Sequence, residues 1–314
     1  MINENYAGVL VSFLLVGGFG FIGKHLIDTA IKCCEDFTVI SRKDPEVNWA
    51  SYPYVLDNTL DDKALFDLAL QHNVVVYLAS SSIPATGSFT REIRENVEPA
   101  IELIDRLTSF NPALKVIYIS SGGQVYGNEY HELISEKAKC LPVSPYGYGK
   151  LMVEESLAYL HRTKKTRIAV LRVANPVGRW QTGLRQGIVN VVFQALMNNN
   201  PVKIFGTGLE VRDYLDADEL AELILRVAKA DFGFTTWNVG SGQATSTIEL
   251  VTKIENIVGK TAVKQYLPRR FVDPEYAVLE CSKLHHDLGW KASQSIDKIL
   301  EKTLAHKLSV STLK

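Results

Sequence analysis

The stretch LLVGGFGFIGKHLI, residues 14–27, decides the fold of this chain. It places an apolar strand directly before Gly18, Gly20 and Gly23, which have the spacing G-x-G-x-x-G, and a helix directly after them. The first glycine permits a tight turn, the second lets the backbone approach a pyrophosphate, and the third lets the helix pack closely. The helix N-terminus adds unpaired N–H groups and partial positive charge. The stretch therefore predicts a dinucleotide-binding strand, turn and helix.

Apolar segments of strand length continue through the first two thirds of the chain and alternate with segments of helical spacing. The expected strands are 11–16, 37–40, 74–78, 116–120, 168–172 and 235–239, and the expected helices are 22–34, 62–71, 92–109 and 150–164. Continuous runs of Val, Ile and Leu are typical of strands that are covered on both faces of a sheet. The alternation predicts an α/β protein with a doubly wound parallel sheet of the Rossmann type.

After Arg172 the alternation weakens and glycine-rich turns follow. Helical spacing returns at residues 218–228, 249–258 and 295–307. We expect a smaller, loop-rich C-terminal lobe that interleaves with the end of the sheet. The expected division gives residues 1–174 and 213–248 to the dinucleotide-binding domain, and residues 175–212 and 249–314 to the second lobe.

The composition excludes several functional classes. The chain has 314 residues, 46% of them hydrophobic and 22% charged, which is typical of a globular protein. A formal charge of −1 gives no overall field that would attract nucleic acid or an anionic membrane. Four cysteines without a CxxC spacing indicate neither a disulfide framework nor a metal site. The first apolar run is too short for a membrane span and lacks signal-peptide flanks, so we expect a cytoplasmic protein.

The residues after the second expected strand bear on which dinucleotide binds. Ser41, Arg42 and Lys43 stand there, and Asp44 follows slightly late. An acid at this place hydrogen-bonds the ribose of NAD, whereas an arginine accommodates the 2′-phosphate of NADP. Arg42 therefore favours NADP, and NAD stays open because the loop could bring Asp44 back. Asp57, which ends the segment YVLDN, is a candidate for an adenine hydrogen bond or a helix cap.

Tyr146 and Lys150 lie in the segment SPYGYGKLMVEESL, where a spacing of four places both side chains on one helix face. An ammonium beside a phenol favours the phenolate, so the phenol could exchange a proton with a substrate hydroxyl near neutral pH. Of the 13 tyrosines, Tyr146 alone has a lysine four residues later. The pair is the candidate for proton transfer.

Several motifs along nearly the whole chain carry a resemblance to a known family. They are GGFGFIG at 17–23, ENV at 95–97, ISSGGQVYG at 119–127, YGYGK at 146–150, RVANPVG at 172–178, VRDYLDADELA at 211–221, WNVGSG at 237–242 and SKLHHDLGW at 282–290. With them the chain resembles an extended short-chain dehydrogenase/reductase of the nucleotide-sugar epimerase/dehydratase family, of the UDP-glucose 4-epimerase type.

The resemblance implies a role for each matching residue. Tyr146 would be the acid/base, and Lys150 would bind the nicotinamide ribose and lower the pKa of Tyr146. The other expected cofactor contacts are Gly17, Gly18, Phe19, Gly20, Phe21, Ile22, Gly23, Ser41, Arg42, Asp57, Ala79, Asn96 and Ser120. The expected substrate contacts are Gly122, Gln124, Asn175, Arg212 and Arg270, the last three at the diphosphate of a nucleotide sugar.

The chain departs from the family pattern at Gly122, where relatives place a Ser or Thr hydroxyl next to the catalytic tyrosine. Ser121 could be repositioned by the two following glycines to act in its place, or Gln124 or a water could do so, or proton transfer rests on Tyr146 alone. Dehydratases of the family have an acidic pair directly after this position. Gly123 and Gln124 stand there, so we do not expect a 4,6-dehydratase.

The resemblance favours a 4-epimerase of a UDP-hexose or UDP-N-acetylhexosamine, which works through a transient 4-keto sugar with retained NAD(P). The alternative is an NADPH-dependent 4-ketoreductase, which Arg42 favours. A non-catalytic nucleotide sensor would not need both Tyr146 and Lys150. The resemblance also implies a part in polysaccharide biosynthesis and a homodimer through helices 92–109 and 150–164, although their apolar spacing could equally reflect burial against the sheet.

Overall fold

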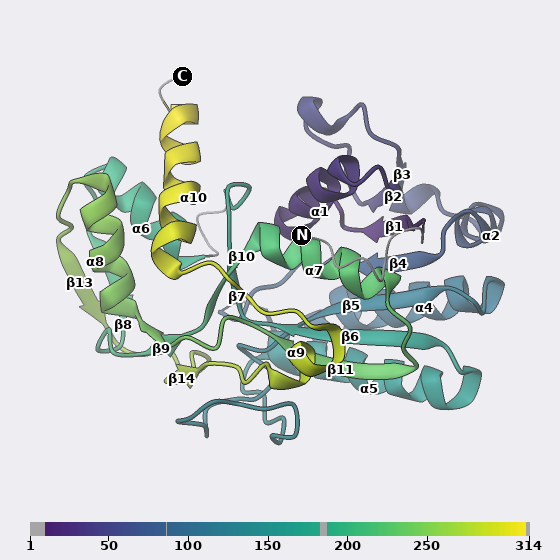
Figure 1. The fold of residues 1–314 in the computed structure, drawn as a ribbon. Coiled ribbons are helices and arrows are strands. Elements are labelled where there is room, and N and C mark those ends of the chain that lie inside the picture. The colour runs from purple at the N-terminus through teal and green to yellow at the C-terminus, as the bar shows by residue number, and fades with distance from the viewer. Residues whose placement is uncertain (1–9, 86, 183–186, 312–314) are drawn as a thin grey trace.

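A seven-stranded parallel sheet forms the centre of the computed structural model, which describes residues 10–85, 87–182 and 187–311. Its strands lie in the order β11-β6-β5-β4-β1-β2-β3 (Figure 1). They are β1 (Ser12–Val16), β2 (Asp36–Ser41), β3 (Tyr54–Leu56), β4 (Val74–Tyr77), β5 (Lys115–Ser121), β6 (Arg167–Val173) and β11 (Phe234–Val239). This order confirms the doubly wound sheet, and its reversal between β1 and β4 is where such sheets bind ligands.

Helices cover both faces of the sheet, which explains its continuous apolar strands. They are α1 (Phe21–Lys32) and α7 (Ala217–Lys229) on one face, and α2 (Asp62–Gln71), α4 (Glu98–Phe110) and α5 (Pro145–Lys164) on the other. Successive residues of a strand point to opposite faces. Phe13 and Leu15 of β1 accordingly join the core beneath α1 and α7, whereas Leu14 and Val16 join the core beneath the other helices.

The helix expected at residues 92–109 is divided into three pieces. It consists of α3 (Phe89–Glu92), a π-helical turn η4 (Ile93–Val97) and α4. Single π turns inside helices are frequent at functional sites. This turn carries Asn96, whose Oδ1 accepts a hydrogen bond from the Ser81 N–H at 2.7 Å, in the loop after β4.

The rest of the chain forms a second lobe from small sheets and helices. The sheet pairs are β7 (Asn175–Val177) with β10 (Tyr214–Asp216), and β8 (Val202–Phe205) with β13 (Lys264–Leu267). The third sheet contains β9 (Val211–Arg212), β12 (Thr245–Ser246) and β14 (Tyr276–Ala277), and the helices are α6 (Ile188–Met197), α8 (Thr247–Val258), α9 (Ser282–Leu288) and α10 (Ile296–Ser311). Figure 1 shows α6, α8, α10 and β13 gathered on the side of the molecule away from β3. The division of the chain at residue 174 stays a proposal.

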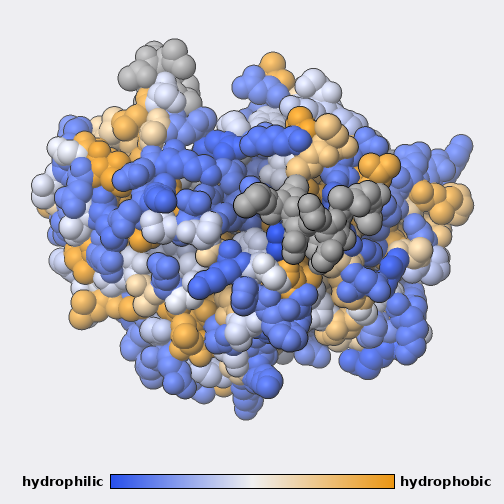
Figure 2. Space-filling view, viewed as in Figure 1, coloured by the Kyte–Doolittle hydropathy of each residue, from blue (hydrophilic) through white to orange (hydrophobic). Residues whose placement is uncertain are grey.

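Two short 3₁₀ turns, η2 (Val47–Trp49) and η3 (Asp57–Thr59), complete the described elements. No helix within the described ranges is long and apolar enough to cross a membrane. Hydrophilic residues cover most of the face in Figure 2, with separate hydrophobic patches between them.

Candidate active site

The glycine turn after β1 leaves its backbone open to an anion. Gly17 has a φ of +80°, and its N–H donates to the Ile40 carbonyl at 2.8 Å. A Cβ on Gly23 would lie 2.1 Å from the Gly18 carbonyl oxygen, so only glycine lets α1 begin this close to the turn. Gly20 caps α1 without a side chain, and the first turn of α1 holds no acid. The first N–H groups of α1 therefore fit the pyrophosphate of a dinucleotide.

The other residues of the predicted loop pack around this turn. A Cβ on Gly17 would lie 2.9 Å from the Ala79 Cα, which places Ala79 directly against the turn. The Phe19 ring lies edge-on to Tyr54, and the Phe21 ring lies edge-on to His25. Ile22 packs on the core beneath α1. The loop thus presents backbone to a ligand while its side chains stabilise the surrounding structure.

The residues expected at the adenosine end lie after β2 and β3. Ser41 Oγ donates to the Lys43 carbonyl at 2.6 Å, and Arg42 is exposed. Burial raises the pKa of Tyr77, at the end of β4, to about 12; the charge of Asp57 also raises it, and that of Arg42 lowers it. Both therefore lie near the switch point between β1 and β4. Asp44, the alternative that would favour NAD, accepts a hydrogen bond from the Tyr54 hydroxyl at 3.1 Å.

Local sequence sets the start of α5 and thereby places the candidate proton-transfer pair. The helix begins at Pro145, and the Ser144 Oγ accepts a hydrogen bond from the Gly147 N–H at 3.0 Å. A serine cap followed by proline is a preferred helix start. Tyr146 consequently lies in the first turn and Lys150 one turn later, with the Lys150 Nζ 5.8 Å from the centre of the Tyr146 ring.

The protonation of Tyr146 differs from what the sequence led us to expect. Burial raises the pKa of Tyr146 to about 12, a hydrogen bond from Ser121 lowers it, and the charge of Glu92 raises it. We expected Lys150 to lower this pKa. Instead the Lys150 ammonium donates to the Ile119 carbonyl at 2.9 Å and does not offset the burial. With only the protein's own groups around it, the phenol is neutral at neutral pH.

Lys150 has a pKa that is displaced in the opposite direction. Burial lowers the pKa of Lys150 to about 8, while the charges of Glu92 and Glu154 raise it. The Nζ also lies 4.9 Å from the centre of the Tyr118 ring. Lys150 is therefore an ammonium below about pH 8 and loses its proton above it.

Gly122 leaves no room for a side chain, and so none for the Ser or Thr hydroxyl that the resemblance led us to expect there. A Cβ at this position would lie 2.5 Å from the Leu279 Cδ1 and 2.9 Å from the Arg172 carbonyl oxygen. Gln124 Oε1 accepts from the Ser144 hydroxyl at 2.9 Å, so it holds the start of α5. Of the alternatives left open by the sequence, the structure contains the one in which Ser121 contacts Tyr146. No local pattern marks Leu279 as the residue that fills this space.

The hydroxyl of Ser120 points into a buried network. It donates to Glu154, whose carboxylate also pairs with Arg172 at 2.7 Å. Arg172 in turn donates to the Tyr126 hydroxyl at 3.0 Å, and this hydroxyl donates to Asn238 at 2.7 Å. The Ser120 side chain therefore joins β5 to α5 and β6. The family resemblance implied that Ser120 contacts the cofactor, and no local pattern of residues indicates this network.

Asn96 is held from two sides in the loop after β4. Its Oδ1 accepts from the Ser81 backbone and hydroxyl at 2.7 and 3.1 Å. Its Nδ2 donates to the Ser82 hydroxyl at 3.2 Å and to the Glu92 carboxylate at 3.1 Å. These bonds tie the π turn to the carboxyl end of β4, beside the switch point.

Two arginines of the second lobe lie close enough to affect one another. Burial lowers the pKa of Arg212, and the charge of Arg270 contributes in the same direction. Arg270 pairs with Asp273 at 2.6 Å, and its guanidinium lies 4.3 Å from the centre of the Phe205 ring. Arg212 Nη1 donates to the Val211 carbonyl at 2.9 Å. Neighbouring guanidinium groups from two segments suit a diphosphate.

Asn175 and Asp213 join the two parts of the molecule. The Asn175 amide donates to the Asp213 carbonyl at 2.8 Å, across the β7 and β10 pair. The buried Asp213 carboxylate accepts hydrogen bonds from the N–H groups of Ser241, Gly242 and Leu279 at 2.8, 3.1 and 3.3 Å. Sequence reasoning passed over Asp213, although it stands next to Arg212 in the motif RDY.

Comparison with known proteins adds to this geometry. Residues 13–240 match the NAD dependent epimerase/dehydratase family. The chain is 27% identical over 305 residues to the dTDP-4-dehydro-6-deoxyglucose reductase of Escherichia coli, covering 93% of this chain and 96% of the relative. It is 26% identical over 330 residues to the UDP-glucose 4-epimerase of Erwinia amylovora, covering 93% and 96%.

A solved structure of the UDP-glucose 4-epimerase of Thermotoga maritima has the same fold. Its TM-score is 0.86 at 25% identity, over 96% of this chain and 100% of that one. The chain therefore belongs to the NAD dependent epimerase/dehydratase family, as an NAD(P)-dependent enzyme of the extended short-chain dehydrogenase/reductase type.

Proposed function

We propose that the enzyme reduces a 4-keto sugar carried on a nucleoside diphosphate, using NADPH. The observations that support this direction are the likeness to a reductase of a dTDP-linked 4-keto sugar and Arg42, which is exposed after β2, where NADP would place its 2′-phosphate. The Tyr146 phenol, whose pKa burial raises to about 12, can donate the proton that the reduction of a ketone requires.

Each residue of the proposed site has a separate role in this reaction. A reduced nicotinamide, when bound, supplies the hydride. Tyr146 donates the proton to the developing C4 oxygen, and Ser121 orients the phenol through its hydrogen bond. Lys150 holds the nicotinamide ribose and adds positive charge near the phenolate that remains. The Leu279 side chain keeps the site small at Gly122.

The cofactor loop supports the same direction. Arg42 is exposed after β2, where a guanidinium can pair with a 2′-phosphate. Asp44 is held by Tyr54, and this contact would have to break for Asp44 to reach a ribose. We therefore keep the preference for NADP over NAD as part of the proposal, and with it a cofactor that exchanges after each turnover.

Arg212, Arg270 and Phe205 form the nucleotide end of the proposed substrate site. The two guanidinium groups suit the diphosphate, and the Phe205 ring supports the Arg270 guanidinium 4.3 Å from its centre. Asn175 lies at the start of β7, between the catalytic end of β6 and these arginines. The reductase relative in Escherichia coli is named for a dTDP-linked 4-keto sugar. We propose this class of substrate for the present chain.

A second candidate is the 4-epimerase of a UDP-hexose or UDP-N-acetylhexosamine. The fold shared with the Thermotoga maritima enzyme, which was solved with UDP-glucose, favours it. An epimerase keeps its cofactor between turnovers and needs a positive nicotinamide to help ionise the tyrosine. The two candidates therefore differ in whether NAD(P) stays bound through purification.

One assay series distinguishes the candidates. Purified protein and its Tyr146→Phe variant are incubated with dTDP- and UDP-linked 4-keto-6-deoxyhexoses plus NADPH, and with UDP-glucose and UDP-N-acetylglucosamine without added cofactor. We expect NADPH-dependent loss of a keto sugar, with kcat about 10²- to 10⁴-fold lower in the variant. Interconversion of UDP-sugars by a retained cofactor would replace the reductase with the epimerase, and activity on none of them would overturn both.

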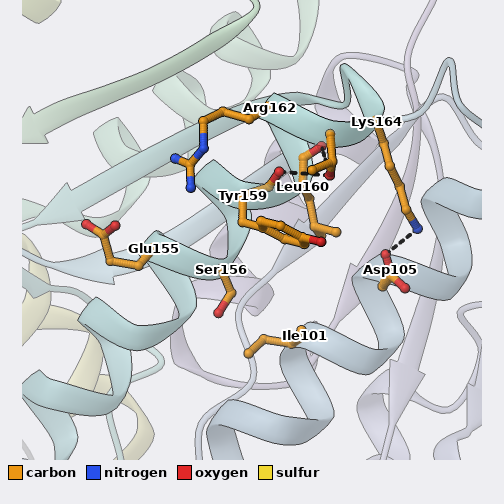
Figure 3. Close-up of a pocket in the computed structure, with 9 residues that line it drawn as sticks. Ile101, Asp105, Glu155, Ser156, Tyr159, Leu160, Arg162 and Lys164 are labelled. Carbon is orange, nitrogen blue, oxygen red and sulfur yellow. Dashed lines mark hydrogen bonds and ion pairs between the residues drawn. The ribbon is translucent and has the colours of Figure 1, made fainter.

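We also propose a homodimer through α4 and α5. A groove of about 650 Å³ lies between these helices, and Tyr159 projects over it above Ile101 (Figure 3). Lys164 and Asp105 pair at 2.5 Å across one end of the groove. Tyr148 is 44% exposed and Tyr159 58% exposed. They are eleven residues apart, about three helical turns, and so lie on the same face of α5.

An exposed aromatic face on α5 is what the helix pairing implied by the family resemblance would cover. Light scattering should give twice the chain mass of 35.0 kDa. A Tyr159→Glu variant should shift the protein to a single chain mass. A single chain mass for the unaltered protein would contradict the proposal.

The proposed reaction fits a cytoplasmic step of polysaccharide biosynthesis. Cys33, Cys34, Cys140 and Cys281 are all free thiols. Free cysteines are typical of proteins in a reducing compartment.

A further inference from the structure

A buried carboxylate outside the roles assigned so far lies beside the catalytic pair. Glu92 ends α3, and its side chain is 3% exposed. A Cβ on Gly149 would lie 2.5 Å from the Glu92 Cγ and 2.7 Å from its Oε1. The carboxylate therefore rests directly on the backbone of α5, between Tyr146 and Lys150.

We propose that Glu92 is the counter-charge that keeps Lys150 an ammonium ion in the buried site, and that it acts in this way as a positioning residue. This inference rests on the proposed roles of Tyr146 and Lys150 in the reaction. Lys150 can hold a ribose hydroxyl and stabilise a phenolate only while it is charged.

Among the groups near Glu92, Lys150 is the cation on which the charge of Glu92 acts. Tyr146 and Lys150 approach it from α5, Tyr118 from β5, and Asn96 from the π turn, where Nδ2 donates to Glu92 at 3.1 Å. Among the described residues, no lysine or arginine makes an ion pair with Glu92 within 4.0 Å. Glu92 therefore has no direct cationic partner among these residues.

Glu154, the other carboxylate that acts on Lys150, is in a different position. It pairs with Arg172 at 2.7 Å and accepts the Ser120 hydroxyl, so its charge is largely balanced. Without Glu92, burial alone would oppose the charge on Lys150. Because burial already lowers the pKa of Lys150 to about 8 with both carboxylates present, the loss of one would bring it toward neutral pH.

Gly149 makes this arrangement possible. Any side chain there would collide with Glu92 and displace the carboxylate from α5. The sequence YGYGK thus contains a glycine whose absent Cβ leaves space for a charge that comes from a different helix.

Charge and shape can be separated with matched variants. Glu92→Gln keeps the volume and the acceptor for Asn96 but removes the charge. Gly149→Ala keeps the charge but displaces it, and it does not weaken α5 because alanine is the better helix former. Glu98→Gln, in the first turn of α4 where the side chain is exposed, is the control for loss of any carboxylate.

The direct readout needs neither cofactor nor substrate. Protein labelled with ¹³C-lysine is titrated by NMR, and the Lys150 resonance is assigned from its absence in Lys150→Arg. We expect a midpoint of about 8 in the unaltered protein and in Glu98→Gln. In Glu92→Gln we expect a midpoint lower by about one pH unit, which makes the ratio of protonated to neutral Lys150 about tenfold smaller at a given pH.

A second readout is the pH profile of NADPH-dependent reduction. Activity should fall as pH rises through about 8 because Lys150 loses its proton, and this fall should begin at lower pH in Glu92→Gln and in Gly149→Ala. If Glu92 had only a structural role, Glu92→Gln would reduce activity equally at every pH. The pH at which activity begins to fall would then be unchanged.

The outcomes separate this inference from the proposed function. An unchanged Lys150 midpoint in Glu92→Gln, or in Gly149→Ala should the first variant fail to fold, overturns the role of Glu92 even when the enzyme reduces a keto sugar. A lowered midpoint in a protein that turns over none of the tested sugars supports the counter-charge and overturns the proposed reaction.

Discussion

The parallel sheet and the second lobe are built by different means. Strands of the sheet are continuous apolar runs, and alternate residues such as Leu14 and Leu15 fill the cores on its two faces. Strands of the second lobe have two to four residues and pair in three separate sheets. Buried polar side chains join the segments there. Asp213, for example, accepts hydrogen bonds from Ser241 and Leu279, which are far from it in the sequence.

The two regions differ in how far along the chain a functional residue lies from the residues that position it. In the sheet, a functional group follows a strand, so local sequence is enough to place it. In the second lobe, a single buried carboxylate positions several loops, so its effect extends over tens of residues. Substitutions in the two regions should therefore fail in different ways.

The largest effect is expected at the turn after β1. Gly23→Ala would put a Cβ 2.1 Å from the Gly18 carbonyl oxygen. This oxygen belongs to the backbone and cannot rotate away from the new methyl group. We expect a loss of about 3 kcal/mol in the free energy of unfolding and at least a hundredfold weaker dinucleotide binding, which corresponds to about 2.7 kcal/mol. Urea unfolding and calorimetric titration with NADPH would measure both.

Gly233→Ala is the matched control for that substitution, because its Cβ would meet only His161 Cε1 at 3.5 Å, an ordinary contact. Equal effects of the two alanines would show that the glycine turn has no special place in the fold.

An intermediate effect is expected at the polar anchor of the second lobe. Asp213→Ala leaves the N–H groups of Ser241 and Gly242 without their acceptor, which should cost about 2 kcal/mol of stability. Because Leu279 is held by the same carboxylate, we expect substrate affinity to fall while NADPH affinity is kept. Asp231→Ala, whose side chain is 96% exposed, should leave both unchanged. Loss of NADPH affinity in Asp213→Ala would show that the second lobe also determines cofactor binding, which contradicts the difference between the two regions.

The smallest effect is expected at the adenosine end of the sheet. Arg42 is exposed, so Arg42→Glu should leave the melting temperature unchanged. It should reduce the preference for NADPH over NADH about tenfold, or about 1.4 kcal/mol, because a carboxylate repels a 2′-phosphate and accepts from a ribose diol. Lys43→Glu makes the same change of charge one residue later. An equal shift in Lys43→Glu would mean that net charge at this edge, rather than Arg42, selects the cofactor.

The sequence was sufficient to predict the sheet, its glycine turn and the helix that carries Tyr146 and Lys150. Each of these depends on residues close together in the chain, such as the serine cap and proline that start α5. The π turn at Asn96 was not predicted, because the hydrogen bonds to Ser81 and Glu92 that accompany it have no periodic signal.

The properties of the site that depend on distant residues could not be predicted. The spacing of Tyr146 and Lys150 indicated a phenolate, yet the burial that raises the pKa of Tyr146 comes from the whole fold. Leu279 fills the space at Gly122 from a segment more than 150 residues away. Glu92 reaches α5 only because Gly149 lacks a side chain. Packing against another element decides each of these features.

The most direct test of the account follows the hydride to C4 of the sugar, in the step in which Tyr146 gives its proton to the C4 oxygen. The enzyme is given NADPH that carries deuterium at the transferred position, together with a dTDP-linked 4-keto-6-deoxyhexose, and the product is examined by NMR. We predict deuterium at C4 of the sugar with the unaltered protein, delivered about 10²- to 10⁴-fold more slowly by Tyr146→Phe. Deuterium at another carbon, or labelling of C4 at an equal rate by the Tyr146→Phe variant, would contradict the account.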